Sequence, residues 1–138
     1  MSAEALLDTN VLIYSISSDP AEKSKCDRAR ALIRDLDFGI SAQVLAEFYV
    51  TATQKIAKRL SENEALQFIA PLVRLPVVAI DSDLVLEAIT LKQQYSISYW
   101  DAAIIAAASR LGAQTIYSED LTHNQMYGSI RVVNPFRG

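Results

Sequence analysis

The sequence predicts a three-layer α/β/α sandwich with a mainly parallel central sheet. Short apolar runs alternate with longer segments of helical periodicity along the chain. Strands that alternate with helices pair in parallel and form a sheet covered on both faces. Hydrophobic residues make up 51% of the 138 residues, enough to bury a core without disulfides or metals. No repeat, low-complexity tract or linker interrupts the chain, so we expect residues 1–138 to form a single domain.

The apolar periodicity and the turn residues together place five strands and six helices along the chain. The expected strands are residues 5–7, 38–40, 77–80, 115–117 and 130–133. The expected helices are residues 11–16, 20–36, 42–58, 62 to between 71 and 74, 82–94 and 99–111.

Capping residues indicate where several of these helices begin and end. Asp19 can cap a helix that has Pro20 in its first position, and Glu22 stands where a capping-box acid belongs. The stretch 61–64, SENE, is a capping box for the fourth helix. Gly112 follows the last helix and is expected to adopt a left-handed conformation there.

The composition limits which cellular compartment and which kinds of partner we expect for this protein. The single cysteine excludes an intramolecular disulfide and fits a reducing compartment. The N-terminus has no basic, apolar leader, and no uncharged run approaches the roughly 20 residues of a membrane span. We therefore expect a cytoplasmic protein without membrane contact. The net charge of −3 argues against a nucleic-acid partner, but two basic clusters leave the question open. They are Lys23, Lys25, Arg28, Arg30 and Arg34, and Lys55, Lys58 and Arg59.

Four acidic residues fall near the place where a parallel sheet binds ligands. Asp8 and Asp120 each follow a predicted strand, and the carboxyl ends of parallel strands meet at one edge. Asp101 begins the last helix, and Glu47 is expected on the apolar side of its own helix. No Lys or Arg stands at a spacing that would pair with Glu47 or Asp101. Such a set of acids favours a divalent cation, and oxygen ligands favour Mg²⁺ or Mn²⁺ over zinc.

Each acid also has a purely structural interpretation. Asp8 can cap the short helix that follows it, and Asp101 stands three residues after Ser98, where a capping-box acid belongs. Glu47 can extend to the surface, and Asp120 lies in a polar turn. Taken singly, none of the four establishes a metal site.

The segments that carry these acids resemble the PIN-domain family, in particular the VapC-type toxin ribonucleases of type II toxin–antitoxin systems. The acidic segments are LLDTNVLIY (6–14), SAQVLAEFY (41–49), SYWDAAIIAAA (98–108) and YSEDL (117–121). The segment IRVVNPF (130–136) resembles the closing strand of this group. The five segments occur in the expected order and span nearly the whole chain.

The resemblance implies a metal-dependent endoribonuclease that hydrolyses RNA and leaves a 5′-phosphate and a 3′-hydroxyl. Four residues match the family's catalytic acids: Asp8, Glu47, Asp101 and Asp120. Three of them would bind Mg²⁺ or Mn²⁺, namely Asp8, Asp101 and Asp120. Asn10 and Ser118 match polar companions that orient the acids or a bound water.

One position departs from the pattern. Some relatives carry an additional acid beyond the position of Asp120, where Leu121 and Thr122 stand here. Glu119 and Asp120 are therefore both candidates for the metal, and we prefer Asp120.

The resemblance also implies partners. In the resembled toxins, the region of residues 21–36 and 44–68 binds an antitoxin protein, and the toxins commonly form homodimers. The net charge of −3 includes the four candidate acids, and without them it is +1, so basic residues around a metal-filled pocket could accept RNA.

Three other functions would fit parts of the sequence. One is a PIN-type RNA-processing nuclease without a toxin role, and another is a PIN-like binding module without catalysis. A third is a receiver-like Mg²⁺-binding signalling domain, which would need an acidic pair before its first helix, whereas Asp8 stands alone.

Overall fold

A six-stranded sheet forms the centre of the computed structural model, which describes residues 2–137. The strand order is β3-β2-β1-β4-β6-β5, and β5 alone runs antiparallel to its neighbour. The strands are β1 (Ala5–Leu7), β2 (Phe38–Ser41), β3 (Val77–Val78), β4 (Thr115–Tyr117), β5 (Met126–Tyr127) and β6 (Ile130–Val133). The mainly parallel sheet that the sequence predicts is confirmed.

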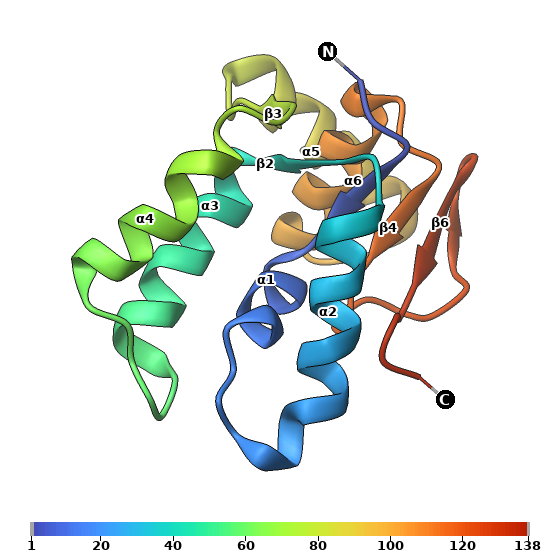
Figure 1. Ribbon diagram of the computed structural model, residues 1–138. Helices are drawn as coiled ribbons and strands as arrows, with labels where there is room; N and C mark the ends of the chain where they lie inside the picture. Colours follow the sequence, from blue (N-terminus) through green and yellow to red (C-terminus); the bar gives the residue numbers. More distant parts are fainter. Residues whose placement is uncertain (1, 138) are drawn as a thin grey trace.

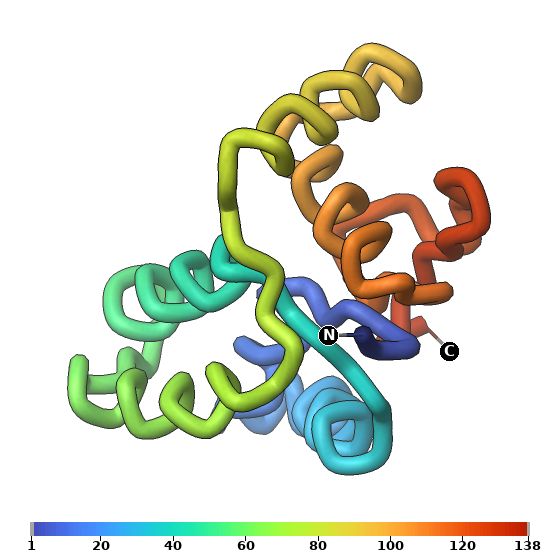
Figure 2. Tube along the Cα trace, turned by 90° about the horizontal axis from the view of Figure 1, so that it is seen from above, coloured from blue at the N-terminus to red at the C-terminus, as the bar shows by residue number. Residues whose placement is uncertain are grey.

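Helices cover both faces of this sheet. Helices α1 and α2 lie on one face and α5 and α6 on the other, while α3 and α4 pack beside α1 and β2 (Figures 1 and 2). The helices are α1 (Thr9–Ser15), α2 (Lys23–Asp35), α3 (Ala42–Val50), α4 (Glu62–Leu72), α5 (Ser82–Tyr95) and α6 (Tyr99–Leu111). In residues 2–137, no helix combines the length and apolar character needed to cross a bilayer.

The core is built around β1 and the middle of α6. All three residues of β1 are buried, because parallel strands flank it on both sides and helices cover its two faces. Helix α6 is buried continuously from Ala102 to Ala108. Its small alanine side chains let it lie close against the sheet, and it contacts β1, β2, β3, β4 and β6.

The direction of α6 decides which end of it reaches the carboxyl edge of the sheet. The backbone N–H of Ala3, just before β1, donates to the carbonyl of Leu111 at 3.2 Å, so α6 ends beside the start of β1. A helix of 13 residues is about 20 Å long, whereas a strand of three residues spans about 10 Å. The first turn of α6 therefore extends past the carboxyl ends of the strands.

Several predicted helix ends are confirmed. Ser61 and Glu64 form a reciprocal capping box at α4, and the Ser98 hydroxyl caps α6. Gly112 ends α6 with φ +67°, the left-handed conformation that the sequence predicts. Asp19 caps the turn that contains Pro20, as predicted.

Other boundaries differ from the prediction. The helix expected over 20–36 begins as a 3₁₀ turn, Pro20–Glu22, and Glu22 accepts a hydrogen bond from the Ser17 hydroxyl in place of completing a capping box. The helix expected over 42–58 leaves α geometry after Val50 and continues as a π-helical turn, Thr51–Lys55. The strand expected over 77–80 contains only Val77–Val78. Helix α1 begins at Thr9, two residues earlier than predicted.

Strand β5 was not predicted. It has only two residues, and it exists because the chain turns back at Gly128, φ +61°, to pair with Ile130 and Arg131. A two-residue strand has no periodicity of its own to detect.

Gly39 in β2 tests the close packing of α6 on the sheet. A Cβ at Gly39 would lie 2.8 Å from both Leu111 Cδ1 and the carbonyl oxygen of Pro76. We expect Gly39→Ala to lower the free energy of unfolding by about 1–3 kcal/mol, measured by urea denaturation. Gly112→Ala is the matched control, because it meets no atom within 4 Å and carries only the cost of its positive φ, about 1 kcal/mol. A larger loss at Gly112 than at Gly39 would contradict this account.

Candidate active site

Asp8 lies at the junction of β1 and α1, where its carboxylate performs two structural tasks. It is the N-cap of α1, and one oxygen, Oδ1, accepts a hydrogen bond from the Thr9 backbone N–H at 2.8 Å. The other oxygen, Oδ2, accepts a hydrogen bond from the Ser118 hydroxyl at 2.7 Å. The backbone N–H of Asp8 donates to the carbonyl of Tyr117 at 3.0 Å, which joins the ends of β1 and β4. The capping interpretation of Asp8 is therefore correct, and it leaves the remaining lone pairs of both oxygens available.

Ser118 organises the loop that follows β4. Its side chain is fully buried, and its hydroxyl donates to Asp8 while accepting hydrogen bonds from the backbone N–H groups of Asp120 and Leu121, at 3.1 and 3.3 Å. One hydroxyl thus links the first candidate acid to the loop that carries the last one.

Asn10 connects the same loop to α1. Its side-chain amide donates to Asp120 Oδ2 at 3.1 Å, and its carbonyl accepts from the backbone N–H of Glu119 at 3.1 Å. Its amide also lies 3.4 Å from the Ser118 hydroxyl. Asn10 and Ser118 are therefore hydrogen-bonded to Asp120 and Asp8, respectively.

Glu47 reaches the same edge from α3. Its carboxylate accepts a hydrogen bond from the Thr9 hydroxyl at 3.1 Å and lies 3.4 Å from the Gln43 amide. The expectation that Glu47 lies on the apolar side of its helix is wrong, because Glu47 is exposed although Val44 and Phe48 are fully buried. One residue turns an α-helix by about 100°, which carries Glu47 out of the buried stripe.

Asp101 is placed by α6 and not by a hydrogen bond to the other acids. Its backbone N–H donates to the Ser98 hydroxyl at 3.1 Å, but within residues 2–137 its carboxylate has no hydrogen-bond partner and completes no capping box. Burial of Tyr127 raises the pKa of its hydroxyl, and the negative charge of Asp101 adds to this rise. Hydrogen bonds through Thr9, Asn10 and Ser118 thus link three of the acids: Asp8, Glu47 and Asp120. Asp101 is not linked to them by a hydrogen bond, and it lies at the same edge of the sheet because the first turn of α6 reaches that edge.

Glu119 and Asp120 have different surroundings. Glu119 accepts a hydrogen bond from the Tyr14 hydroxyl at 2.6 Å and pairs with the Lys25 ammonium at 2.6 Å. Although burial alone would raise the pKa of Glu119, these two partners hold it below its ordinary value. Asp120 is exposed, and Asn10 holds its carboxylate beside Asp8. The geometry therefore supports Asp120 over Glu119 as the acid of the site.

Sequence reasoning did not find the roles of Tyr14 and Lys25. Lys25 comes from α2, and its ammonium lies over the rings of Tyr14 and Phe136, 4.8 and 5.9 Å from their centroids. Its single local signal was membership of a basic cluster. The partner acid is 94 residues away in the sequence, so no spacing rule could have identified the pair.

The electrostatics of the site centre on Asp8. Burial raises the pKa of Asp8 from 3.8 to about 6, the Ser118 and Thr9 hydrogen bonds oppose this rise, and the charges of Glu47 and Asp120 add to it. No ion pair within residues 2–137 involves any of the four candidate acids. Among the described residues, the site therefore has a buried carboxylate with acidic neighbours and no basic side chain in an ion pair with them.

These residues fit an open metal site better than a closed cage. In the described part of the chain, no three His, Cys, Asp or Glu side chains are close enough together to hold an ion by themselves. Mg²⁺ commonly uses one or two carboxylates, keeps several waters and takes further oxygens from substrate phosphates. The carboxylates of Asp8 and Asp120 match that requirement, because their neighbours are acidic and neither forms an ion pair with a basic side chain in the described chain.

The fold and this set of acids define a class of protein with acidic residues at the carboxyl edge of a parallel sheet. The PIN-domain family model matches residues 5–128, and the chain belongs to the PIN-domain family. A search of curated proteins finds no significant match.

Solved structures share the fold over most of the chain. One is a toxin–antitoxin complex from Klebsiella pneumoniae, with a TM-score of 0.70 and 21% identity over 95% of this chain and 97% of that one. FitAB bound to an IR36 DNA fragment has a TM-score of 0.69 and 23% identity, covering 96% of each chain. Mycobacterium tuberculosis VapC20, described as a sarcin-ricin loop cleaving toxin, has a TM-score of 0.66 and 18% identity over 84% of this chain and 89% of that one. At these identities the likeness concerns the fold.

The raised pKa of Asp8 leads to a prediction about stability. In the metal-free protein, the folded state keeps the Asp8 proton up to about pH 6, whereas the unfolded chain loses it near pH 3.8. The folded state binds more protons in this interval, so the free energy of unfolding should fall as the pH rises from 4 to 6.5. The expected cost at neutral pH is about 3 kcal/mol, and Asp8→Asn should recover most of it.

Urea denaturation in EDTA between pH 4 and 7.5 measures this effect. The matched control is Asp83→Asn, which makes the same chemical change at an exposed carboxylate on α5, away from the buried site. Equal pH profiles for the wild type and Asp8→Asn would show that the burial of Asp8 carries no such cost.

Proposed function

We propose that the chain is a Mg²⁺- or Mn²⁺-dependent endoribonuclease and the toxin of a VapBC-type toxin–antitoxin pair. The observation that carries this proposal is the buried Asp8 carboxylate, which has Glu47 and Asp120 as electrostatic neighbours and no basic partner in the described chain. A buried charge without a partner is costly. The chain belongs to the PIN-domain family. A nuclease site would explain why a buried carboxylate is kept at this position despite its energetic cost.

The chain's own residues would position the substrate and the reacting water. The Asp8 and Asp120 carboxylates would hold the metal, with Ser118 and Asn10 fixing their orientation. Asp101 would complete the set from the first turn of α6. A bound ion would lower the pKa of a coordinated water and neutralise charge on the phosphodiester.

Glu47 has a different role in this proposal. Its carboxylate is exposed and is held by the Thr9 hydroxyl, next to the metal-binding acids and not among them. It is suited to accept the proton that the attacking water loses, provided that the water lies within hydrogen-bond reach in the complex. In-line attack would then leave the 5′-phosphate on one product and the 3′-hydroxyl on the other.

The proposed partners follow from the structural neighbours. The Klebsiella pneumoniae structure is a toxin–antitoxin complex, and FitAB and the Rickettsia felis VapBC2 were both solved bound to DNA. VapC20 is described as a toxin that cleaves the sarcin-ricin loop. By analogy, we propose a cognate antitoxin as protein partner, RNA as substrate, a homodimer as the assembly and the cytoplasm as the compartment.

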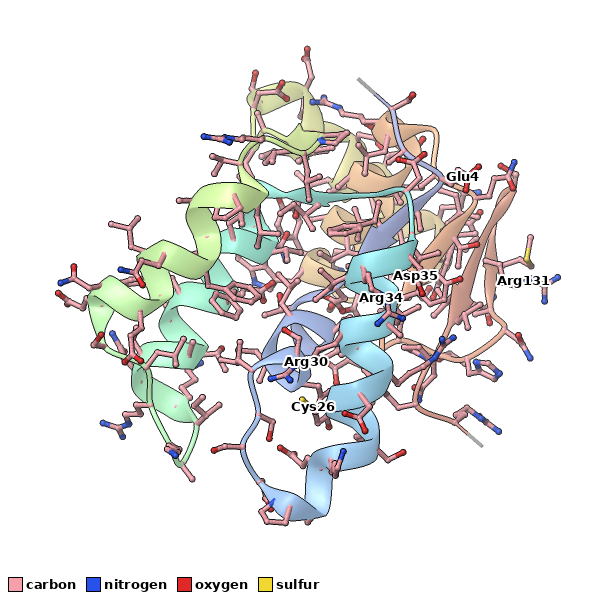
Figure 3. The ribbon with its side chains drawn as sticks, in the orientation of Figure 1. Glu4, Cys26, Arg30, Arg34, Asp35 and Arg131 are labelled. Carbon is pink, nitrogen blue, oxygen red and sulfur yellow. The ribbon has the colours of Figure 1, made fainter. Side chains whose placement is uncertain are left out.

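The two basic clusters separate in the structure. The cluster on α2 is largely engaged within the chain: Lys25 pairs with Glu119, Arg30 donates to the Ser15 carbonyl and Arg34 pairs with Asp35 (Figure 3). The second cluster is exposed and makes no ion pair in the described chain: Lys55, Lys58 and Arg59. Of the two, the second is the better candidate for contacts with RNA phosphates.

Lys55 also lies close to one of the candidate acids. It lines, together with Glu47, a depression of about 270 Å³ on the surface of α3 and the π-helical turn. A phosphate near Glu47 would therefore have a cation within reach.

Cleavage assays with single-site variants test the proposal. We expect Asp8→Asn and Asp101→Asn to reduce cleavage of single-stranded RNA at least 1000-fold while the proteins stay folded by circular dichroism, because each removes a proposed metal ligand. EDTA should abolish cleavage by the wild type, and added Mg²⁺ or Mn²⁺ should restore it. Sequencing of RNA 5′ ends after induced expression should show new 5′-phosphate ends for the wild type alone.

Two outcomes would contradict this proposal. Identical RNA 5′-end profiles for the wild type and Asp8→Asn would show that the proposed nuclease activity is absent. Unfolding of Asp101→Asn would show that this carboxylate is needed for the fold, and the loss of cleavage could not then be assigned to a lost metal ligand. A growth assay separates a toxin from an RNA-processing nuclease. A toxin should arrest growth when the wild type is expressed but not when Asp8→Asn is expressed, whereas cells should tolerate expression of an RNA-processing nuclease.

Charge reversal tests the phosphate-binding role of the second basic cluster. Replacing Lys55, Lys58 and Arg59 with Glu should weaken RNA binding and reduce the slope of log affinity against log salt by about 2, because three phosphate contacts would be lost. RNA binding is measured by fluorescence anisotropy between 50 and roughly 200 mM salt.

The matched control reverses three arginines near the amino ends of the strands: Arg34, Arg74 and Arg131. Arg131 projects from β6 on the far side of the sheet from α3 (Figure 3). If both triple variants change the slope equally, the effect is one of net charge and not of this cluster.

A further inference from the structure

Trp100 is the one tryptophan of the sequence, and the proposed nuclease chemistry does not use it. It stands directly before Asp101 in the first turn of α6, and its side chain is 62% exposed. The other exposed large hydrophobic residues of the described chain lie on other elements. An exposed tryptophan beside a candidate catalytic acid therefore requires a specific explanation, because tryptophan is usually well buried.

The indole ring is supported from within the fold. Tyr99 packs against the hydrophobic core, and its ring meets that of Trp100 edge to face, with centroids 5.0 Å apart and an interplanar angle of 81°. The Ser98 hydroxyl caps the same turn. Trp100 is thus an aromatic surface on a rigid helix start and not a side chain on a loop.

The position of Trp100 associates it with the acidic edge of the sheet. The first turn of α6 extends beyond the carboxyl ends of the strands, since α6 ends beside Ala3 at the amino side. The opposite end of α6 is marked by Arg110, which pairs with Asp81, the N-cap of α5, and with Glu87 within α5. Trp100 is therefore placed on the side where a strand of substrate would enter.

We infer that Trp100 is a stacking platform for one nucleobase of single-stranded RNA, next to the phosphate that is cleaved. This inference rests on the proposed function and adds a binding subsite to it. Stacking of a base on an aromatic side chain contributes roughly 5- to 150-fold in affinity and tolerates any base, because every base has a π-face. The subsite would set the register of the strand over Asp101 without selecting a sequence.

A nucleobase fits this surface better than a protein partner does. A protein that covered this first turn of α6 would approach the Asp101 carboxylate, which has no partner in the described chain, and burial of that carboxylate without a partner would be costly. A strand of RNA brings a π-face for the indole and leaves the neighbouring carboxylate in contact with water and cations. Trp100 is also the one large apolar residue that α6 itself exposes in the described chain, whereas a protein interface commonly uses a cluster of anchors.

The single tryptophan makes the inference directly measurable. Asp8→Asn in Mg²⁺ is titrated with a labelled single-stranded oligoribonucleotide of about ten residues, the span of a typical single-strand site. Anisotropy of the label reports binding, and intrinsic fluorescence reports stacking on Trp100. We expect tryptophan emission to be quenched in step with binding, and to be unchanged by an abasic strand with the same number of phosphates.

Kinetic measurements provide a second readout. Trp100→Ala should raise KM about 10-fold and change kcat less than about 2-fold, because stacking acts on the bound strand and not on the reaction. Trp100→Phe should recover most of the loss, since phenylalanine keeps a stacking face. Leu86→Ala is the matched control: Leu86 is 63% exposed on α5, toward the Arg110 end of α6, and its variant should match the wild type.

The outcomes separate this inference from the proposed function. Binding by anisotropy without quenching, or wild-type KM for Trp100→Ala in an enzyme that cleaves RNA, would overturn the stacking role and leave the nuclease intact. Emission that depends on protein concentration and not on RNA would assign Trp100 to contact with a second copy and would also overturn it. Absence of RNA binding in both the wild type and Asp8→Asn would overturn the inference together with RNA as the substrate.

Discussion

The hydrogen bond between the Ser118 hydroxyl and the buried Asp8 carboxylate is the contact on which the rest of the site depends. It joins the residue after β1 to the residue after β4, and these are the two central strands of the sheet. The same hydroxyl accepts the backbone N–H groups that shape the loop around Asp120. Because Ser118 is fully buried, this arrangement has little freedom to relax. The carboxyl edge is thus preorganised before any ligand arrives.

Glu119 and Asp120 show how the fold distributes negative charge. Lys25 and Tyr14 neutralise and hold Glu119, so this carboxylate serves structure and anchors α1 and α2 to the loop. Asp120, one residue on, receives the Asn10 amide and stays exposed beside Asp8. One acid therefore supplies stability around the site, while in residues 2–137 the acids within the site form no ion pair with a basic side chain.

The carboxyl edge gathers groups from the whole length of the chain. Asp8, Glu47, Asp101 and Asp120 come from four different elements, with Lys55 beside Glu47 and Trp100 beside Asp101. Anionic, cationic and aromatic groups therefore surround one end of the sheet. A single strand of nucleic acid presents phosphates and bases to such a surface at the same time, and this is the physical basis of both proposals.

The sequence by itself determined the fold class, the caps of α4 and α6 and the identity of the candidate acids, because these depend on local periodicity and on residues a few positions apart. Asn10 and Ser118 entered through the family resemblance, which names polar companions of the acids at these positions. Only the tertiary structure decided that Glu119 pairs with Lys25 and that Glu47 is exposed, and it alone revealed β5. Each of these depends on contacts between distant segments: the partner of Glu119 lies on α2, and the partner of β5 is formed by the turn at Gly128. The charge balance at the site depends on which distant segments pack together, and a local sequence pattern contains no information about that packing.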